Sequence, residues 1–236
     1  MSVLAVLGTG TGVGKTVATA AIAALSPDVV TVLKPAQTGI GLDEPGDVAL
    51  VKRLVPHVET LELVRYPDPL APASAARRSG IPTLSVTEVA DGIEEADADL
   101  VLLEGAGGVL VRLSDEPLLT FADLVAELAA PAVLVTSAGL GTLNHTALSL
   151  EALDRRGVEC AGVIIGSWPE QPDLASRTNV ADLELLIGGP LAGVLPEGMA
   201  DLPPAQFERV ARAGLSPRFG GQFDADRFGS RVKGLQ

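Results

Sequence analysis

Residues 8–16 read GTGTGVGKT and stand between an apolar run at Val3–Leu7 and a segment with helical spacing at Val17–Leu25. Glycines let successive backbone N–H groups turn inward around phosphate oxygens, and the start of the following helix adds the positive end of its dipole. Lys15 supplies a point charge, and the Thr16 hydroxyl can coordinate Mg²⁺. A glycine-rich turn explains the glycines but not the Gly-Lys-Thr between strand and helix, so the stretch predicts a P-loop.

The spacing of this loop departs from the usual P-loop pattern. Gly8 lies one residue too early, and Thr9 takes the place of the first glycine, so the loop is one residue longer. We still expect the nucleotide phosphates to contact the end of the loop and the start of the helix, at Gly12, Val13, Gly14, Lys15, Thr16 and Val17.

Further apolar runs rich in Val, Ile and Leu recur along the chain, and most are separated by segments with helical spacing. Runs that are apolar on both faces indicate strands covered on both sides. The alternation predicts a single-domain α/β fold of the P-loop NTPase type, with a mostly parallel sheet flanked by helices on both faces. The expected strands are Val3–Leu7, Val29–Leu33, Leu100–Leu103, Ala132–Thr136, Gly162–Ile165 and Leu191–Leu195, and the expected helices are Val17–Leu25, Val86–Ala96, Phe121–Ala129, Asn144–Arg156 and Asn179–Leu186.

We expect one domain over residues 1–215, because 236 residues, 47% of them hydrophobic, suffice for one core. Residues 67–82 contain four prolines and read as a loop with at most a short helix. Residues 216–236, rich in Gly, Arg and Phe, read as a poorly ordered C-terminal extension.

The composition narrows the classes of partner. A net charge of −13 repels phosphate backbones and anionic lipid, so neither nucleic acid nor a membrane is an expected partner. No run approaches the roughly 20 apolar residues that span a bilayer. The single cysteine, Cys160, cannot form an intramolecular disulfide, which fits a reducing cytoplasm.

Charged residues follow two of the expected strands, at the edge where open parallel sheets bind ligands. Lys34 follows Val29–Leu33, and a solvated lysine accounts for it as well as a second cation on a transferred phosphoryl group does. Glu104 ends Leu100–Leu103 and precedes a glycine-rich turn, which favours an Mg²⁺ ligand over an ordinary strand-end acid. Asp47 on its own reads as a helix N-cap.

Two further features leave alternatives open. The stretch from Gly139 to His145 leads into a helix whose free N–H groups could bind a carboxylate, although capping by Asn144 is the simpler explanation. Trp168 could stack on a nucleobase, and packing at the rim of the sheet explains it equally well.

Taken together, these stretches resemble the dethiobiotin synthetase family, in order and spacing, from about residue 2 to residue 200. They are the extended P-loop, Lys-Pro-Ala-Gln-Thr-Gly at 34–39, the Asp47 segment, Glu-Gly-Ala-Gly-Gly at 104–108 and Leu-Gly-Thr-Leu-Asn-His at 140–145. The resemblance implies a homodimer that uses ATP, Mg²⁺ and CO2 or bicarbonate to convert 7,8-diaminopelargonate to dethiobiotin in biotin synthesis. The implied intermediates are a carbamate and a carbamic-phosphoric anhydride.

The resemblance also implies roles for individual residues. Lys34 and Lys15 would act on the transferred phosphoryl group, and the Thr38 hydroxyl would contact the carbamate or the diamine. Thr16, Asp47 and Glu104 would be Mg²⁺ ligands, so for Asp47 the resemblance replaces the helix-cap interpretation. Further nucleotide contacts would come from Gly105, Ala106, Gly107, Gly166, Ser167, Pro196, Glu197 and Gly198. The substrate would contact Thr11 and Gly107, and its distal carboxylate would meet the other subunit's Gly141, Thr142, Leu143 and Asn144 at the dimer interface.

One departure concerns the nucleobase. Many relatives carry an Asn-Asp-like pair that reads adenine where this chain has Gly166-Ser167. Losing those polar groups weakens discrimination, so we hypothesise that several nucleoside triphosphates, such as CTP, are accepted.

The main alternative is a nucleotide-switch ATPase of the ParA/MinD type. Such proteins carry a signature lysine five residues before the P-loop lysine, and that position is Gly10 here. They usually engage DNA or membrane, for which a strongly acidic chain is poorly suited.

Overall fold

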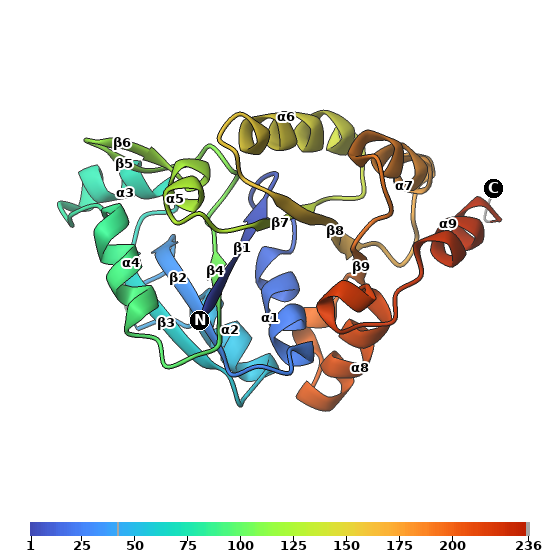
Figure 1. The fold of residues 1–236 in the computed structure, drawn as a ribbon, viewed down its shortest axis with the longest axis horizontal. Helices are drawn as coiled ribbons and strands as arrows, with labels where there is room; N and C mark the ends of the chain where they lie inside the picture. The colour runs from blue at the N-terminus through green and yellow to red at the C-terminus, as the bar shows by residue number, and fades with distance from the viewer. Residues whose placement is uncertain (42, 235–236) are drawn as a thin grey trace.

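The computed structural model describes residues 1–41 and 43–234. Its main sheet has seven strands in the order β3-β2-β4-β1-β7-β8-β9, and all pairings between these neighbours are parallel (Figure 1). The strands are β1 (Ser2–Gly8), β2 (Val30–Thr38), β3 (Glu59–Tyr66), β4 (Leu100–Glu104), β7 (Ala132–Thr136), β8 (Cys160–Trp168) and β9 (Gly193–Pro196). The predicted parallel α/β fold is confirmed, and the P-loop leaves the sheet from its central strand.

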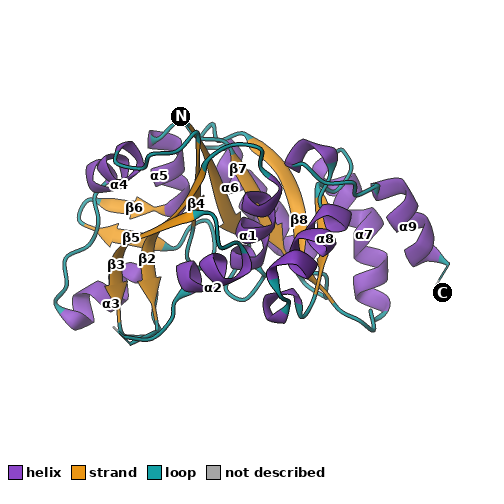
Figure 2. Ribbon diagram, turned by 90° about the horizontal axis from the view of Figure 1, so that it is seen from below, coloured by secondary structure: helices purple, strands orange, loops and turns teal. Residues whose placement is uncertain are grey.

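Helices cover both faces of the sheet (Figure 2). Helices α1 (Lys15–Leu25), α2 (Asp47–Leu54) and α8 (Pro204–Gly214) pack on one face. The other face carries α3 (Pro72–Ser79), α4 (Val86–Glu94), α5 (Phe121–Glu127), α6 (Thr142–Asp154) and α7 (Leu174–Ile187). None of the helices in residues 1–41 and 43–234 is both long and apolar enough to cross a bilayer.

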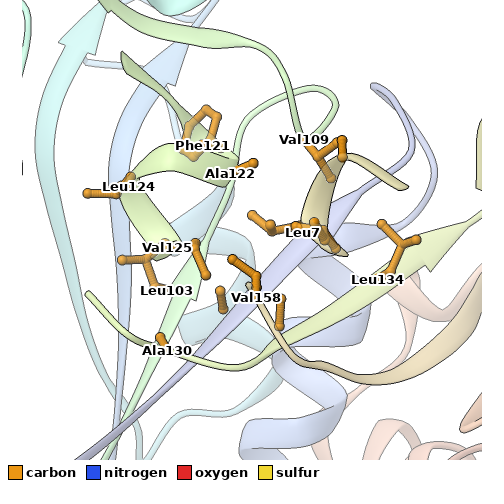
Figure 3. Close-up of a cluster of buried hydrophobic side chains, with 14 of the residues drawn as sticks. Leu7, Leu103, Val109, Phe121, Ala122, Leu124, Val125, Ala130, Leu134 and Val158 are labelled. Carbon is orange, nitrogen blue, oxygen red and sulfur yellow. The ribbon is translucent and has the colours of Figure 1, made fainter. Parts of the chain in front are cut away.

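Side chains of the central strands alternate between two buried clusters. Leu7 of β1 lies in the same cluster as Leu124 and Val125 of α5 (Figure 3), whereas its neighbour Val6 lies in the cluster that holds Ala18 of α1. Because successive strand residues point to opposite faces, a run that is apolar at every position is buried on both sides. This arrangement is what the continuous Val, Ile and Leu runs predicted.

Two parts of the sheet structure were not predicted. Edge strand β3 pairs with β2, and most of its residues are only half-buried. Because an edge strand is partly exposed to solvent, β3 can carry charged residues such as the ion pair Glu62–Arg65 among its apolar residues. Its sequence therefore shows no continuous apolar run. The antiparallel hairpin of β5 (Arg112–Asp115) and β6 (Leu118–Thr120) is too short to give a periodic pattern.

Strand β2 is longer than the predicted Val29–Leu33. Its pairing with β4 ends at Leu33, whereas its pairing with β3 continues to Thr38. The sheet can therefore accommodate Pro35. A proline has no N–H to donate to a neighbouring strand, and at this position the neighbour β4 no longer pairs with β2. The sequence predicted that Lys34 lies just after the end of a strand. In the structure it lies within β2, at the point where β4 separates from β2.

The expectation of poor order after residue 215 is wrong for the described part of that stretch. A 3-10 helix, η2 (Pro217–Phe219), follows α8, and helix α9 (Ala225–Lys233) follows η2. Phe219, Phe228 and Val232 are buried, so the aromatic residues of this segment anchor it to the domain. A second 3-10 helix, η1 (Met199–Asp201), precedes α8.

Candidate active site

The P-loop connects β1 to α1 and is held by its own lysine. Gly12 and Gly14 have φ angles of 75° and 95°, in the left-handed region that favours glycine. Lys15 Nζ donates to the carbonyl oxygen of Gly10 at 2.9 Å and to that of Gly107 at 3.0 Å. The lysine thus joins the P-loop to the turn that follows β4.

Beside the P-loop lies a buried cluster of charged side chains. Lys34 Nζ lies 2.9 Å from Glu104 Oε1 and 2.6 Å from Asp47 Oδ2, and it donates to the Gly105 carbonyl at 3.1 Å. The Thr16 hydroxyl donates to the same Glu104 oxygen at 2.8 Å. Lys34 and Glu104 are only 2% and 1% exposed. Charges buried this deeply are tolerated only when they are paired, so the contacts fix all four side chains relative to the P-loop.

The two lysines differ in how firmly they hold their charge. The pKa of Lys15 is lowered to about 8, first by burial and then by the nearby charge of Lys34, against the opposing effect of Glu104 and Asp47. Burial also opposes the charge of Lys34, but Glu104 and Asp47 outweigh it, so the pKa of Lys34 is raised. Lys34 is therefore a permanent cation at neutral pH, whereas the pKa of Lys15 lies close to neutral pH.

Asp47 begins α2 but does not cap it, so the helix-cap interpretation of this residue is wrong. The N-cap is Gly46, which has no side chain to cap the helix. The Asp47 backbone N–H donates to Gln37 Oε1 at 3.0 Å, and the Asp47 carboxylate contacts Lys34. A contact with a lysine thirteen residues away, rather than local capping, explains the aspartate.

The cluster offers oxygen ligands suited to Mg²⁺. Within residues 1–41 and 43–234, no three His, Cys, Asp or Glu side chains gather as a self-sufficient metal site. Mg²⁺ in nucleotide enzymes is typically held by one or two carboxylates together with substrate phosphates and waters. Two carboxylates and a hydroxyl, from Asp47, Glu104 and Thr16, fit that requirement.

A cleft of about 520 Å³ opens over the cluster. Most of the residues predicted to act at the phosphate and carbamate line it, namely Thr11, Gly12, Gly14, Lys15, Thr16, Val17, Lys34, Thr38, Asp47, Glu104, Ala106 and Gly107. Gly105 contributes its carbonyl to Lys34, and Val13 packs below the loop. Residues that sequence reasoning missed also line the cleft, namely Ala36, Gln37, Ile40, Leu70, Ala71, Pro72 and Val111.

A second cleft, of about 640 Å³, lies at the carboxyl ends of β8 and β9. The predicted Pro196, Glu197 and Gly198 line it together with Trp168. The Glu197 backbone N–H donates to the Trp168 carbonyl at 2.8 Å, which joins the ends of the two strands. Gly166 and Ser167 line neither cleft and lie on β8 just before Trp168.

The backbone of Gly166 is pressed against the P-loop. A Cβ atom at Gly166 would lie 2.2 Å from the Val13 carbonyl oxygen, and one at Gly14 would lie 2.3 Å from the Gly166 carbonyl oxygen. Only glycine fits such a close approach of two backbones. Gly166, which stands where many relatives carry an Asn-Asp-like pair, is therefore needed for the close packing of β8 against the P-loop.

Residues 141–144 begin α6 and line neither cleft. The N-cap is Gly141, with φ 94° and no capping side chain, so the proposed capping by Asn144 is wrong. Leu140, just before the helix, is 94% exposed. Residues 141–144 therefore do not contribute to either cleft within the same chain.

Comparison with known proteins identifies the family of the chain. Residues 2–202 match a family model described as an AAA domain. The ATP-dependent dethiobiotin synthetase BioD of Saccharopolyspora erythraea is 58% identical over 225 residues, which cover 94% of this chain and 99% of that protein. The protein of the same name from Frankia casuarinae is 57% identical over 238 residues, covering 99% and 100%.

The chain belongs to the dethiobiotin synthetase family. The predicted resemblance is confirmed, and this synthetase is an ATP-dependent ligase of the kind that forms C–N bonds.

Solved structures show the fold of the synthetase but nothing finer. Apo McdA from Cyanthece aligns with a TM-score of 0.55 at 11% identity, covering 89% of this chain and 90% of that one. The ParA family ATPase from Chlorobium tepidum aligns with a TM-score of 0.54 at 14% identity, covering 98% of each. At such low identity the ParA/MinD similarity is a distant fold relation, so the alternative function is not supported.

Proposed function

We propose that the protein carboxylates 7,8-diaminopelargonate with CO2 and closes the ring to dethiobiotin, using ATP and Mg²⁺ in the cytoplasm as a step of biotin synthesis. The observation that carries the proposal is the buried contact of Lys34 with Glu104 beside the P-loop. The contact supports the proposal because it keeps Lys34 charged next to the loop on which the nucleotide's phosphates would bind.

The chemistry needs three bond-forming steps. One amine of the diamine adds to CO2 and forms a carbamate. A carbamate oxygen then attacks the γ-phosphorus of ATP, the bond to the β-γ bridging oxygen breaks, and ADP leaves. The second amine attacks the carbonyl carbon of the mixed anhydride, the C–O bond breaks, and phosphate leaves as the cyclic urea closes. Because the middle step brings two anions together, it depends on cations placed at the developing charge.

The two lysines supply those cations. Lys15 exchanges the carbonyls of Gly10 and Gly107 for phosphate oxygens. Lys34 donates to the oxygens that pass between the carbamate and the phosphoryl group. Thr38 lies four residues after Lys34 on the same strand, so both side chains point to one face and line one cleft. Its hydroxyl orients the carbamate or the diamine.

Mg²⁺ would be held by Thr16, Asp47 and Glu104. When bound, the ion neutralises charge on the β- and γ-phosphates. Lys34 contacts both of these carboxylates, so the residues that hold the ion also set the position of the catalytic lysine.

The nucleoside end of ATP would lie in the second cleft, against Pro196, Glu197 and Gly198. Gly166 and Ser167 offer no side-chain amide or carboxylate to read adenine, which supports the hypothesis that several nucleoside triphosphates serve. Turnover is to be compared with ATP, CTP and GTP at saturation. A strict requirement for ATP would rule the hypothesis out.

The distal carboxylate of the substrate would be received by residues 141–144 of a second copy of the chain, in a homodimer. Support comes from the start of α6, where no side chain caps the helix and Leu140 is 94% exposed. Backbone N–H groups at such a helix start can hold a carboxylate. Sedimentation should give a dimer, and a monomer that is fully active would contradict this arrangement.

The function is tested by incubating the purified protein with 7,8-diaminopelargonate, bicarbonate, Mg²⁺ and ATP. The expected product is dethiobiotin, detected by mass, with one ADP for each molecule formed. The Lys34→Ala variant should form dethiobiotin far more slowly than the native protein. Hydrolysis of ATP without dethiobiotin would contradict the proposal.

A further inference from the structure

We propose that helix α9 forms part of the nucleotide site, and that the Arg231 guanidinium contacts the nucleoside moiety of the bound nucleotide. The inference rests on the proposed placement of the base in the second cleft. It gives a function to the C-terminal segment, which none of the motifs described above includes.

The second cleft is built from three segments distant in sequence. Trp168, Glu170 and Pro172 come from the end of β8 and the loop after it, and residues 196–198 come from the end of β9. Arg231 and Val232 of α9 complete its lining. In Figure 1, α9 stands at the right edge of the molecule, beyond α7 and β9. The last helix of the chain therefore closes one side of the cleft.

The cleft is within reach of a nucleotide on the P-loop. Gly166 of β8 touches the backbone of Val13 and Gly14. Trp168 follows Gly166 by two residues, about 7 Å further along an extended strand. A ligand whose phosphates lie on the P-loop can extend past Gly166 into the second cleft.

Helix α9 is anchored by its apolar side. Phe228 is 9% exposed and Val232 is 2% exposed. The Phe228 ring meets the Trp168 ring edge to face, with centroids 5.1 Å apart and planes at 78°. Trp168 thus packs against an aromatic residue at the rim of the sheet, and the same indole lines the cleft. Any movement of α9 would move this wall.

Arg231 lines the second cleft, and within residues 1–41 and 43–234 no carboxylate pairs with it. Its Cζ atom lies 5.3 Å from the centroid of the Phe228 ring, at cation–π distance. No ion pair is found for Arg231 among the described residues. A guanidinium has five N–H donors and no acceptor, so, as far as the described residues go, Arg231 has donors to offer a ligand.

The charge of the cleft favours this role. Glu170 and Glu197 are exposed at its edge, and Arg231 is the one basic residue among the described residues that line it. Without Arg231, an acidic cleft in a chain of net charge −13 would repel an anionic nucleotide. The ring nitrogens and carbonyls of a base and the hydroxyls of ribose are acceptors that match the guanidinium donors.

The test is a binding titration of the full-length protein, with no diamine present. Arg231→Ala should raise the Kd for ATP roughly 10-fold, as expected for loss of a charge-assisted hydrogen bond. The Kd for inorganic tripolyphosphate should not change, because that probe has no nucleoside. Arg227→Ala, on the same helix but outside the cleft, is the matched control and should bind both ligands normally.

Two results would overturn the inference. One is an unchanged Kd for ATP in Arg231→Ala, and the other is an equal rise for ATP and tripolyphosphate, which would place the effect at the phosphates. Hydrogen exchange gives an independent measure. Residues 225–233 should exchange more slowly with ATP than with tripolyphosphate, and equal protection by the two ligands would contradict the role of α9.

Because binding is measured without turnover, failure of this inference is distinguishable from failure of the proposed reaction. If dethiobiotin is formed, Arg231→Ala should raise the KM for ATP and leave kcat within about two-fold of the native value. A fall in kcat at saturating ATP would show that Arg231 acts on the reaction and not on nucleotide binding.

Discussion

The two ends of the proposed nucleotide site are built in opposite ways. At the phosphate end, Lys34 and Glu104 are almost fully buried and contact each other, so neither can be exchanged without stranding a charge. At the nucleoside end, Glu170, Glu197 and Arg231 are exposed, and Trp168 and three prolines are among the other residues of the lining. The difference indicates that reaction chemistry constrains the first end, whereas the second end can change its base preference at little cost in stability.

The largest effect is expected at the buried lysine. Lys34→Ala should lower kcat about 10²–10³-fold, the usual loss when one group that stabilises transition-state charge is removed. The rate of phosphate release and the thermal unfolding midpoint are to be measured together, because Glu104 loses its partner. Lys52→Ala, which removes an exposed surface ion pair with Glu59, is the control and should have little effect. A Lys34→Ala enzyme within ten-fold of the native rate would contradict the assignment.

A smaller effect is expected at the acid that Lys34 shares with Thr16. Glu104→Gln keeps the size of the side chain but removes a charged oxygen from the predicted Mg²⁺ site. The Mg²⁺ concentration for half-maximal activity should rise about 10–100-fold. Glu59→Gln, at an exposed glutamate, should leave the Mg²⁺ dependence unchanged. An unaltered Mg²⁺ requirement in Glu104→Gln would remove this residue from the metal site.

The junction between the two ends is tested by Gly166→Ala. The added Cβ would lie 2.2 Å from the Val13 carbonyl oxygen, so the P-loop has to shift. Overpacking of this kind costs about 1–3 kcal/mol, which lowers the unfolding midpoint by about 2–12 °C. The affinity for both ATP and tripolyphosphate should fall as well. Gly189→Ala, where a Cβ meets no atom within 4 Å, is the matched control.

The smallest effect is expected from pH. The pKa of Lys15 is lowered to about 8, so in the free protein its charge is lost as the pH rises through that value. Phosphate stabilises the charged lysine, so ATP binding should take up a proton above pH 8, and the affinity should fall by up to about 10-fold between pH 7 and pH 9. Lys15→Arg, which stays charged, should abolish the dependence in a calorimetric titration. A dependence that persists in Lys15→Arg would assign it to another group.

The sequence predicted the phosphate end well, for a physical reason. In a parallel sheet the carboxyl ends of the strands lie at one edge, so Lys15, Lys34 and Glu104 were expected to meet although 89 residues separate the first from the last. The contact of Asp47 with Lys34 was not derivable from local pattern. A helix start favours a capping role for an acid, and Gln37, whose side chain accepts from the Asp47 backbone N–H instead, has no sequence signal of its own.

The nucleoside end was predicted only in part. Residues 196–198 were expected to contact the nucleotide, and they line the second cleft. Helix α9 was missed because its order depends on the packing of Phe228 against Trp168, 60 residues earlier in the chain. A short segment rich in Gly and Arg does not show in advance which distant ring it will pack against. Edge strand β3 was missed for a similar reason, because its half-exposed residues show no continuous apolar run.

The central claim is that the cations around Lys15 and Lys34 let a carbamate oxygen attack the γ-phosphorus of ATP. The most direct measurement follows oxygen from bicarbonate into phosphate. With ¹⁸O-labelled bicarbonate and 7,8-diaminopelargonate, each phosphate released during a short reaction should carry one ¹⁸O atom, seen by mass or by the ³¹P isotope shift. Phosphate that carries oxygen from water alone, while dethiobiotin still forms, would contradict the account.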